Sequence, residues 1–239
     1  MEVLVSTTIK LHAWGEFACF TRPEMKVERM SYDVMTPSAA RGIVEAIYWK
    51  PEIRWHIERL HVLKPIRFTS LRRNEVASKI PAGNVSKAIK GSSASLALYV
   101  EEDRQQRAAT VLRDVGYVIE AQFEIVGGEL NVAKHLDQFS RRARDGRCFH
   151  RPYLGCREFP ADFALIESDD EMPESQLAET EERNLGWMLD DMEYVPDPNG
   201  PVIDSHQGGH WRVEARFFPA TMVNGVIDVE ACRRKGVRS

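Results

Sequence analysis

The chain has 239 residues, of which 43% are hydrophobic, and a formal net charge of −4 at pH 7. This composition predicts a packed core and excludes a wholly disordered protein. No run of about 18 apolar residues occurs, which excludes a membrane-spanning helix. The N-terminal residues lack the pattern of a signal peptide, so we expect a cytoplasmic protein.

The charge is unevenly distributed along the chain. Between Glu158 and Pro201 there are 14 acidic residues and one basic residue, Arg183, so this segment carries −13 and the rest carries +9. A basic body with one acidic segment is compatible with a polyanionic partner. Solvated surface charge explains the pattern equally well.

Metal and cofactor sites are not predicted. The four cysteines (Cys19, Cys148, Cys156 and Cys232) are scattered without a CxxC pair, which is typical of reduced thiols in a cytoplasmic protein. The sequence also lacks a GxSxG elbow, a phosphate-binding P-loop, a dinucleotide-binding GxGxxG and an HExxH zinc motif. We therefore expect a protein without a cofactor or metal ion.

Two helices and several strands are predicted from the N-terminus onward. Residues 3–14 alternate as a strand, and residues 36–49 form a helix in which Thr36 suits the N-cap and Pro37 the first helical position. Residues 53–69 give one or two strands, and residues 72–95 form a mobile basic loop. The clearest strand spans residues 111–125. A second helix over residues 131–143 begins with Asn131 as its cap, and short strands follow at 154–159, 185–194 and 211–223.

This order of elements predicts the fold class. The first 146 residues are predicted to form a strand, a helix, further strands and a second helix. This order favours an α+β, ferredoxin-like (RNA-recognition-type) antiparallel sheet with helices on one face. We expect two domains. Residues 1–150 form the ferredoxin-like domain, and residues 151–239 form a smaller, mostly β domain with an acidic insertion at 167–182.

The adjacent pair Lys134-His135 is the candidate for chemistry, since it precedes a cluster of arginines. Cutting RNA without a metal requires activation of a ribose 2′-hydroxyl, a proton for the leaving 5′-oxygen and neutralisation of the phosphorane. Histidine can transfer either proton near neutral pH, lysine stabilises negative charge, and a tyrosine hydroxyl can orient or donate. Taken alone, the pair is more typical of a surface lysine beside a half-buried histidine. Tyr48, at the end of a helix, is more typical of a core aromatic.

A resemblance changes this balance. The chain resembles the CRISPR-associated Cas-five family of subtype I-C, also called Dvulg, whose members process the precursor of guide RNA. The segments that carry the resemblance are FACFTRP at 17–23, SYDV at 31–34, GIVEAIYWKP at 42–51, LKPI at 63–66, LRDVGY at 112–117, Lys134-His135 and YLGCREF at 153–159.

The resemblance implies an endoribonuclease with a ferredoxin-like RNA-recognition domain and a small β domain. It places the active site at Tyr48, Lys134 and His135. The implied reaction cuts a repeat hairpin at the 3′ base of its stem by 2′-hydroxyl attack, leaving a 2′,3′-cyclic phosphate. The protein is then expected to keep the 5′ handle of the guide RNA and to join the surveillance complex beside its backbone-forming and large subunits.

Basic residues near these segments are the candidates for RNA binding: Lys50, Arg72, Arg73, Arg141, Arg142 and Arg157. Double-stranded DNA is a further possible partner. Two alternatives remain open from the sequence. One is a subunit that binds the 5′ handle without cutting, and the other is nonspecific duplex binding, which the +9 body permits.

Overall fold

The computed structural model describes residues 4–25, 27–92, 96–128, 130–177, 182–199 and 210–239. Its centre is a six-stranded sheet in which β1 (Ile9–Ala18), β2 (Ile53–Val62), β4 (Arg104–Ile125), β5 (Asp162–Ile166) and β8 (Val226–Asp228) run in the order β5-β1-β4-β2-β8. The sixth strand, β3 (Phe68–Val76), pairs with β4. All these pairings are antiparallel, so the predicted α+β class with an antiparallel sheet is confirmed.

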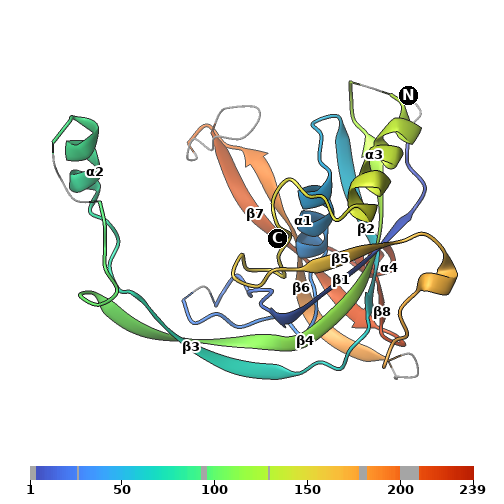
Figure 1. The fold of residues 1–239 in the computed structure, drawn as a ribbon, viewed down its shortest axis with the longest axis horizontal. Coiled ribbons are helices and arrows are strands. Elements are labelled where there is room, and N and C mark those ends of the chain that lie inside the picture. The colour runs from blue at the N-terminus through green and yellow to red at the C-terminus, as the bar shows by residue number, and fades with distance from the viewer. Residues whose placement is uncertain (1–3, 26, 93–95, 129, 178–181, 200–209) are drawn as a thin grey trace.

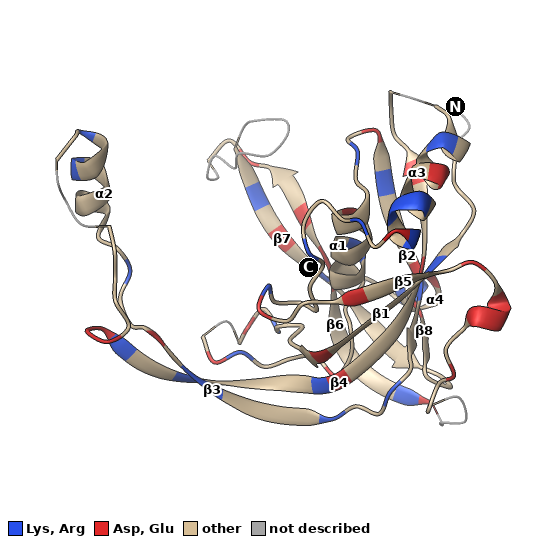
Figure 2. Ribbon diagram, in the orientation of Figure 1, with Lys and Arg blue, Asp and Glu red and all other residues tan. Residues whose placement is uncertain are grey.

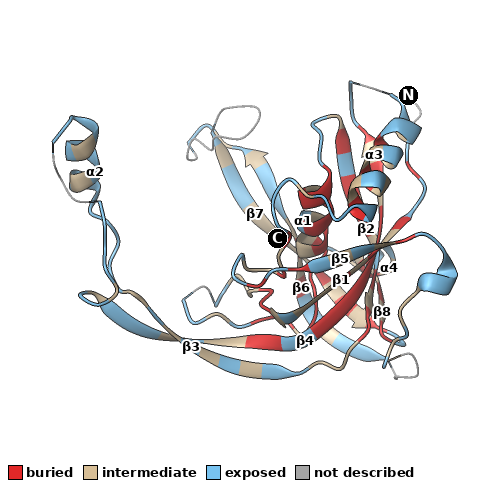
Figure 3. Cartoon of the chain, in the orientation of Figure 1, coloured by how far each residue is buried: buried red, intermediate tan, exposed pale blue. Residues whose placement is uncertain are grey.

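One face of this sheet forms the hydrophobic core. Figure 3 shows that buried residues are concentrated on the central strands of the sheet. Alternate residues of β1, β2 and β4 point to this face and are buried, as the period-two pattern of a strand requires. Helices α1 (Pro37–Ile47) and α3 (Val132–Arg144) contribute Ile43, Ile47 and Phe139 to the same core. The core thus holds both predicted helices against the sheet.

The caps of these two helices agree with the sequence prediction. The Thr36 side chain accepts a hydrogen bond from the Ala39 N–H, and Pro37 occupies the start of α1. The Asn131 side chain accepts from the Lys134 N–H at the start of α3. Each side chain satisfies an N–H group that has no partner within the helix. No helix among the described ranges is long and apolar enough to cross a membrane.

The most prominent feature is an arm that extends from the body (Figure 1). It consists of β3, the short helix α2 (Ala82–Ile89) and the first half of β4, which pairs with β3 from Arg104 to Leu112. The expectation of a mobile loop at 72–95 is therefore wrong for its described residues. Both faces of the arm are largely in solvent, so its sequence lacks the apolar alternation that marks a half-buried strand.

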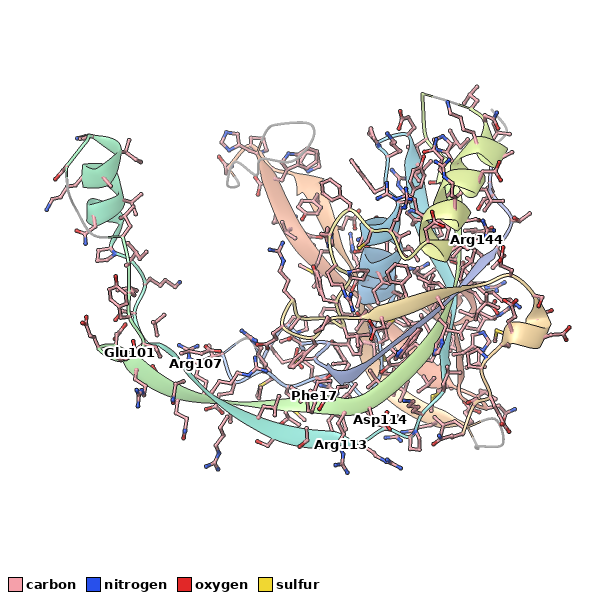
Figure 4. The ribbon with its side chains drawn as sticks, in the orientation of Figure 1. Phe17, Glu101, Arg107, Arg113, Asp114 and Arg144 are labelled. Atoms are coloured by element: carbon pink, nitrogen blue, oxygen red, sulfur yellow. The ribbon has the colours of Figure 1, made fainter. Side chains whose placement is uncertain are left out.

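The arm joins the body at Arg113 and Asp114 (Figure 4). Asp114 has a φ of +51°, a left-handed conformation that aspartate tolerates better than most residues. Beyond this point β4 becomes the central strand of the sheet, between β1 and β2. The strand therefore begins at Arg104, before the predicted start at 111, and its first half pairs mainly with β3.

The second face of the sheet is more polar. Glu120 of β4 is buried there and accepts hydrogen bonds from His61 and Arg59. The acidic segment after β5, which contains the short 3-10 helix η1 (Asp169–Glu171), passes beside this face and pairs Asp169 with Lys10 at 2.6 Å. Figure 2 shows the acidic residues of η1 at the edge of the body.

A separate two-stranded sheet is formed by β6 (Arg183–Pro196) and β7 (Trp211–Met222), close to the predicted strands at 185–194 and 211–223. Helix α4 (Val229–Arg234) follows β8 and is the last element along the chain. Arg233 of α4 pairs with Asp190 of β6 at 2.7 Å. Residues beyond 150 thus build the β6–β7 sheet and also supply β5 and β8 to the main sheet.

The strand predicted at 154–159 is a turn. Gly155 has a φ of +84°, and a Cβ at this position would lie 2.1 Å from the Cys19 carbonyl oxygen. The chain can pass so close to β1 only with glycine in a left-handed conformation. The apolar residues Leu154 and Phe159, which suggested a strand, are buried in the main core.

Candidate active site

Tyr48 is placed by the end of α1. It is the C-cap residue, with an extended backbone whose N–H donates to the Val44 carbonyl. The next residues, Trp49 to Pro51, cannot continue the helix because proline disfavours helical geometry in the residue before it. The indole N–H of Trp55 donates to the Tyr48 carbonyl at 3.0 Å. The tyrosine is therefore fixed from both α1 and β2.

Lys134 and His135 lie in the first turn of α3. His135 shares the inner stripe of this helix with Phe139 and Ala143, which follow it by four and eight residues and are both buried. Lys134 precedes it by one position and is exposed. The amphipathic pattern of α3 therefore turns the histidine inward and the lysine outward.

The structure brings Tyr48 and His135 together across 87 residues of chain. The tyrosine hydroxyl forms a hydrogen bond with Nδ1 of His135 at 2.8 Å. Phe123 of β4 packs against the imidazole edge to face, with ring centroids 6.0 Å apart. Each of the two bonded side chains is 4% exposed. Two of the three predicted catalytic residues thus form a buried pair, and Lys134 lies beside it at the surface.

The charge around Tyr48 favours its neutral hydroxyl. Burial raises the pKa of Tyr48, the Glu52 carboxylate raises it further, and Arg142 acts in the opposite direction. At neutral pH the hydroxyl therefore stays protonated and can hydrogen-bond to the imidazole. Glu52 was not among the residues predicted for the site. Its only signal in the sequence is its place directly after the Trp49-Lys50-Pro51 run.

Three predicted RNA-binding residues lie on or next to the elements that carry this pair. Lys50 is exposed two positions after Tyr48. Arg141 and Arg142 lie in the second half of α3, where Arg141 is exposed and Arg142 is half-buried. Arg142 follows His135 by seven residues, which places both on the same side of the helix. Of these three cations, Arg142 is the one whose charge acts on Tyr48, against that of the Glu52 carboxylate.

The other three candidates lie at the base of the arm. Successive residues of β3 face opposite sides, so Arg72 is exposed on the outer face, whereas Arg73 points inward. Arg73 forms an ion pair with Glu158 and lies over the Phe159 ring, 5.3 Å from its centroid. Arg157 is exposed on the neighbouring turn. The structure thus divides the predicted cations into two groups.

The turn that contains Gly155 and Phe159 has a structural role that sequence analysis missed. Its Glu158 binds Arg29 at 2.7 Å as well as Arg73. The Leu154 carbonyl accepts from the Cys19 N–H at 3.0 Å. The turn therefore connects β1, the base of the arm and the main core. Among the described parts of the chain, no three His, Cys, Asp or Glu side chains come together as metal ligands.

Comparison with known proteins places the chain among CRISPR-associated proteins. The family model Cas_Cas5d, described as CRISPR-associated protein (Cas_Cas5), matches residues 8–230. A curated protein of Mannheimia succiniciproducens named CRISPR pre-crRNA endoribonuclease Cas5d is 54% identical over 230 residues, covering 94% of this chain and 96% of the relative. One of the same name from Thermus thermophilus is 41% identical over 228 residues, covering 93% and 91%.

Two solved structures share the fold over the full length of both chains. One is described as a CRISPR-associated protein and is 22% identical with a TM-score of 0.67. The other, the functionally uncharacterized protein SMU1763c of Streptococcus mutans, is 20% identical with a TM-score of 0.64. At these identities the likeness concerns the fold alone. The family match and the two relatives together show that this chain belongs to the CRISPR-associated Cas5d family.

Proposed function

We propose that this chain is an endoribonuclease that cleaves CRISPR repeat hairpin RNA and so produces mature guide RNA. The observation that carries the proposal is the 2.8 Å hydrogen bond between the Tyr48 hydroxyl and Nδ1 of His135, with Lys134 on the same helical turn. The relatives at 54% and 41% identity are named pre-crRNA endoribonucleases, which indicates the substrate class.

The proposed reaction is attack of a ribose 2′-hydroxyl on the adjacent phosphorus, with departure of the 5′-oxygen. It leaves a 2′,3′-cyclic phosphate and a 5′-hydroxyl. Because Tyr48 engages Nδ1 of His135, Nε2 is the ring nitrogen proposed to exchange a proton with the RNA. The Lys134 ammonium group stabilises the negative charge that develops on the phosphorane. The proposed reaction uses these side chains and no metal ion.

RNA binding has to expose the pair for this reaction, since Tyr48 and His135 are each 4% exposed. We propose that the backbone phosphates bind first to the two groups of cations. Lys50, Arg141 and Arg142 would hold the strand near the pair, and Arg72, Arg73 and Arg157 would hold it at the base of the arm. Ionic contacts of this kind position a nucleic acid without reading its sequence.

The proposal also includes the cut position, the fate of the product and the partner subunits that the family resemblance implies. The cut falls at the 3′ base of the hairpin stem, the protein keeps the 5′ handle, and the complex joins the backbone-forming and large subunits of the surveillance complex. Double-stranded DNA is a second polyanion that the same basic surface could bind. The cytoplasm is the proposed place of action because the substrate is a transcript.

We also propose that the fold is ferredoxin-like, of the RNA-recognition type. Catalysis and RNA binding are assigned to residues 1–150, which contain Tyr48, Lys134 and His135. Residues 151–239 are assigned a supporting role, because they supply two strands of the main sheet and the β6–β7 sheet.

A second candidate function is a subunit that binds the 5′ handle without cutting, with nonspecific binding of duplexes. The burial of Tyr48 and His135 is the observation that favours it. Incubating the purified chain with its own repeat RNA, with and without EDTA, separates the two functions. We expect one cut with a cyclic phosphate at the new 3′ end, at the same rate in both conditions.

The site is tested in the same assay by His135→Ala. General acid–base catalysis contributes about 10²–10⁴-fold, so we expect a loss of that size with RNA affinity retained. His56→Ala is the matched control, since His56 lies in β2 and pairs with Glu124 at 3.2 Å. Cleavage that persists in His135→Ala would exclude the proposed site. Cleavage that disappears with EDTA would exclude the metal-independent reaction.

A further inference from the structure

The segment from Arg147 to Tyr153, here called the strap, follows α3 and alternates aromatic and basic side chains: Arg147, Phe149, His150, Arg151 and Tyr153. Phe149 is 87% exposed, the highest value among the large hydrophobic residues that the structure describes. Leaving a phenylalanine in water forgoes the free energy that its burial would contribute. The exposed ring is therefore a candidate for contact with a binding partner.

The strap is held firmly in place. The Phe149 N–H donates at 2.7 Å to the Ala46 carbonyl, which lies in the last turn of α1 where helical donors are lacking. The Pro152 carbonyl accepts from the Ala161 N–H at 2.9 Å. Pro152 itself is buried. The exposed ring thus stands on a fixed backbone rather than on a frayed end.

The strap presents a row of rings along α1. The His150 and Tyr153 rings are stacked, with centroids 6.1 Å apart and planes 27° apart. Tyr153 also borders a hollow of about 260 Å³, whose wall includes the Thr21 and Ser38 side chains. This volume is below the range of typical drug-sized ligand pockets. Flat rings beside a small hollow with hydroxyl groups suit one planar heterocycle with polar edges.

The row begins next to the candidate active site. Ala46, which the Phe149 backbone contacts, precedes Tyr48 by two residues, so their Cα atoms are at most about 7.6 Å apart. The strap then runs back along α1 to Gly42, which lines the same hollow as Tyr153 (Figure 1). A Cβ on Gly42 would meet no atom within 4 Å, so this side is open.

The charge of the strap is suited to nucleic acid. The side chains of Arg147 and Arg151 are 73% and 62% exposed, although each also contacts a carboxylate, Asp145 and Asp162 respectively. Aromatic rings interleaved with cations are typical of surfaces that bind single-stranded nucleic acid, because every base has a face that can stack.

From these observations we infer that the strap binds unpaired nucleotides next to the cleaved phosphate, with one base stacked on Phe149 and another on Tyr153 at the hollow. This inference rests on the proposed function for the identity of the RNA. It adds a base-binding site to a centre whose other predicted contacts are to phosphate and ribose. Stacking of this kind is tolerant of sequence, so the strap positions the strand.

The test uses repeat RNA with 2-aminopurine at single unpaired positions beside the stem and 2′-deoxyribose at the cut, so that binding is measured without cleavage. Stacking on an aromatic ring quenches this fluorophore. We expect quenching at one or two positions with the wild-type chain. We expect its loss in Phe149→Ala or Tyr153→Ala, with affinity for the RNA lowered about five- to a hundredfold.

Three further variants make the test specific. Phe149→Trp should keep affinity within about twofold, whereas Phe149→Leu should resemble Phe149→Ala, because a stacked base needs a ring. Tyr194→Ala, which removes a 53% exposed aromatic from β6, is the matched control and should change neither quenching nor affinity. Equal affinity of Phe149→Leu and wild type would show apolar packing and overturn the inference.

The failures of the two proposals are distinguishable. If the chain binds repeat RNA with quenching at the strap but does not cut the all-ribose RNA, the proposed reaction fails and the strap stands. If it cuts normally and Phe149→Ala leaves quenching and affinity unchanged, the strap inference fails alone. Loss of a partner subunit from the assembled complex in that variant, with RNA binding intact, would assign the ring to a protein contact and equally overturn the inference.

Discussion

The body and the arm of this protein hold their side chains in different ways. In the body, Tyr48 and His135 are fixed by burial between α1, α3 and the sheet, and each is 4% exposed. In the arm, α2 has no buried residue, and Ile89 is 81% exposed. An isolated two-stranded hairpin is marginally stable in water. The arm persists because its strand β4 continues into the centre of the sheet.

This contrast indicates which region can carry which task. Proton transfer needs atoms held within a fraction of an ångström, and the packed body supplies that precision. A surface that binds a long, negatively charged partner has to be extended and to carry cations. The arm extends from the body and carries Lys and Arg side chains (Figure 2). Figure 4 shows Glu101 and Arg107 on the arm, well separated from Arg144 at the end of α3.

The largest contrast is expected for core substitutions. Phe139 is fully buried and packs against Trp55, with ring centroids 5.0 Å apart. Phe139→Ala should lower the free energy of unfolding by about 3–5 kcal/mol in urea denaturation, because it leaves a cavity. The matched substitution Ile89→Ala on the arm should change it by less than about 0.5 kcal/mol. Similar losses would mean that α2 is also packed in solution.

Two glycines with nearly the same conformation give the next contrast. Gly155 has a φ of +84° and no room for a Cβ, whereas Gly91 on the arm has a φ of +82° and no atom within 4 Å of where a Cβ would lie. Gly155→Ala should therefore combine strain of about 1–2 kcal/mol with a steric cost of about 1–3 kcal/mol. Gly91→Ala should show the strain alone. Equal losses in thermal unfolding would contradict the close approach to Cys19.

A third contrast concerns buried and exposed charge. The hydrogen bond from His61, together with Arg59, holds the pKa of Glu120 below its usual value of 4.5. Its ionised form therefore adds stability that is present above pH 4.5 and lost as the pH falls through the lowered pKa. Glu120→Gln should cost about 1–3 kcal/mol at pH 7.

The wild type and Glu120→Gln should then converge in stability as the pH falls below about 4.5. On the arm, Glu75 pairs with Arg107 and Arg29 at 3.6 and 3.9 Å, and both distances are long for an ion pair. Glu75→Gln should change the free energy of unfolding by less than about 1 kcal/mol. A pH-independent difference between wild type and Glu120→Gln would contradict the assigned charge network.

The smallest effect is expected for single cations at the base of the arm. Arg72→Gln should reduce the slope of log affinity against log salt for repeat RNA by about one, without a change in stability. Arg73→Gln should instead loosen the contact with Glu158 and Phe159 and lower stability by about 1 kcal/mol. An unchanged salt slope in Arg72→Gln would remove this residue from the proposed RNA surface.

Much of the body was predictable from local patterns. The caps Thr36 and Asn131 and the apolar spacing that follows them define both helices, because these signals act within a few residues. The strands β2, β6 and β7 were predicted for the same reason. The arm was not predicted, because its strands pair mainly with each other and β3 has no buried residue.

For the candidate site, the residue types were already present in the amino-acid sequence, and the family resemblance assigned them to Tyr48, Lys134 and His135. The folded structure added the hydrogen bond between Tyr48 and His135 and the effect of Glu52 on the pKa of the tyrosine. It also showed that Arg72 and Arg73 point in opposite directions. The position of the strap against α1 came from the folded structure as well. Contacts between residues 87 positions apart depend on how the elements pack, and no local pattern contains that information.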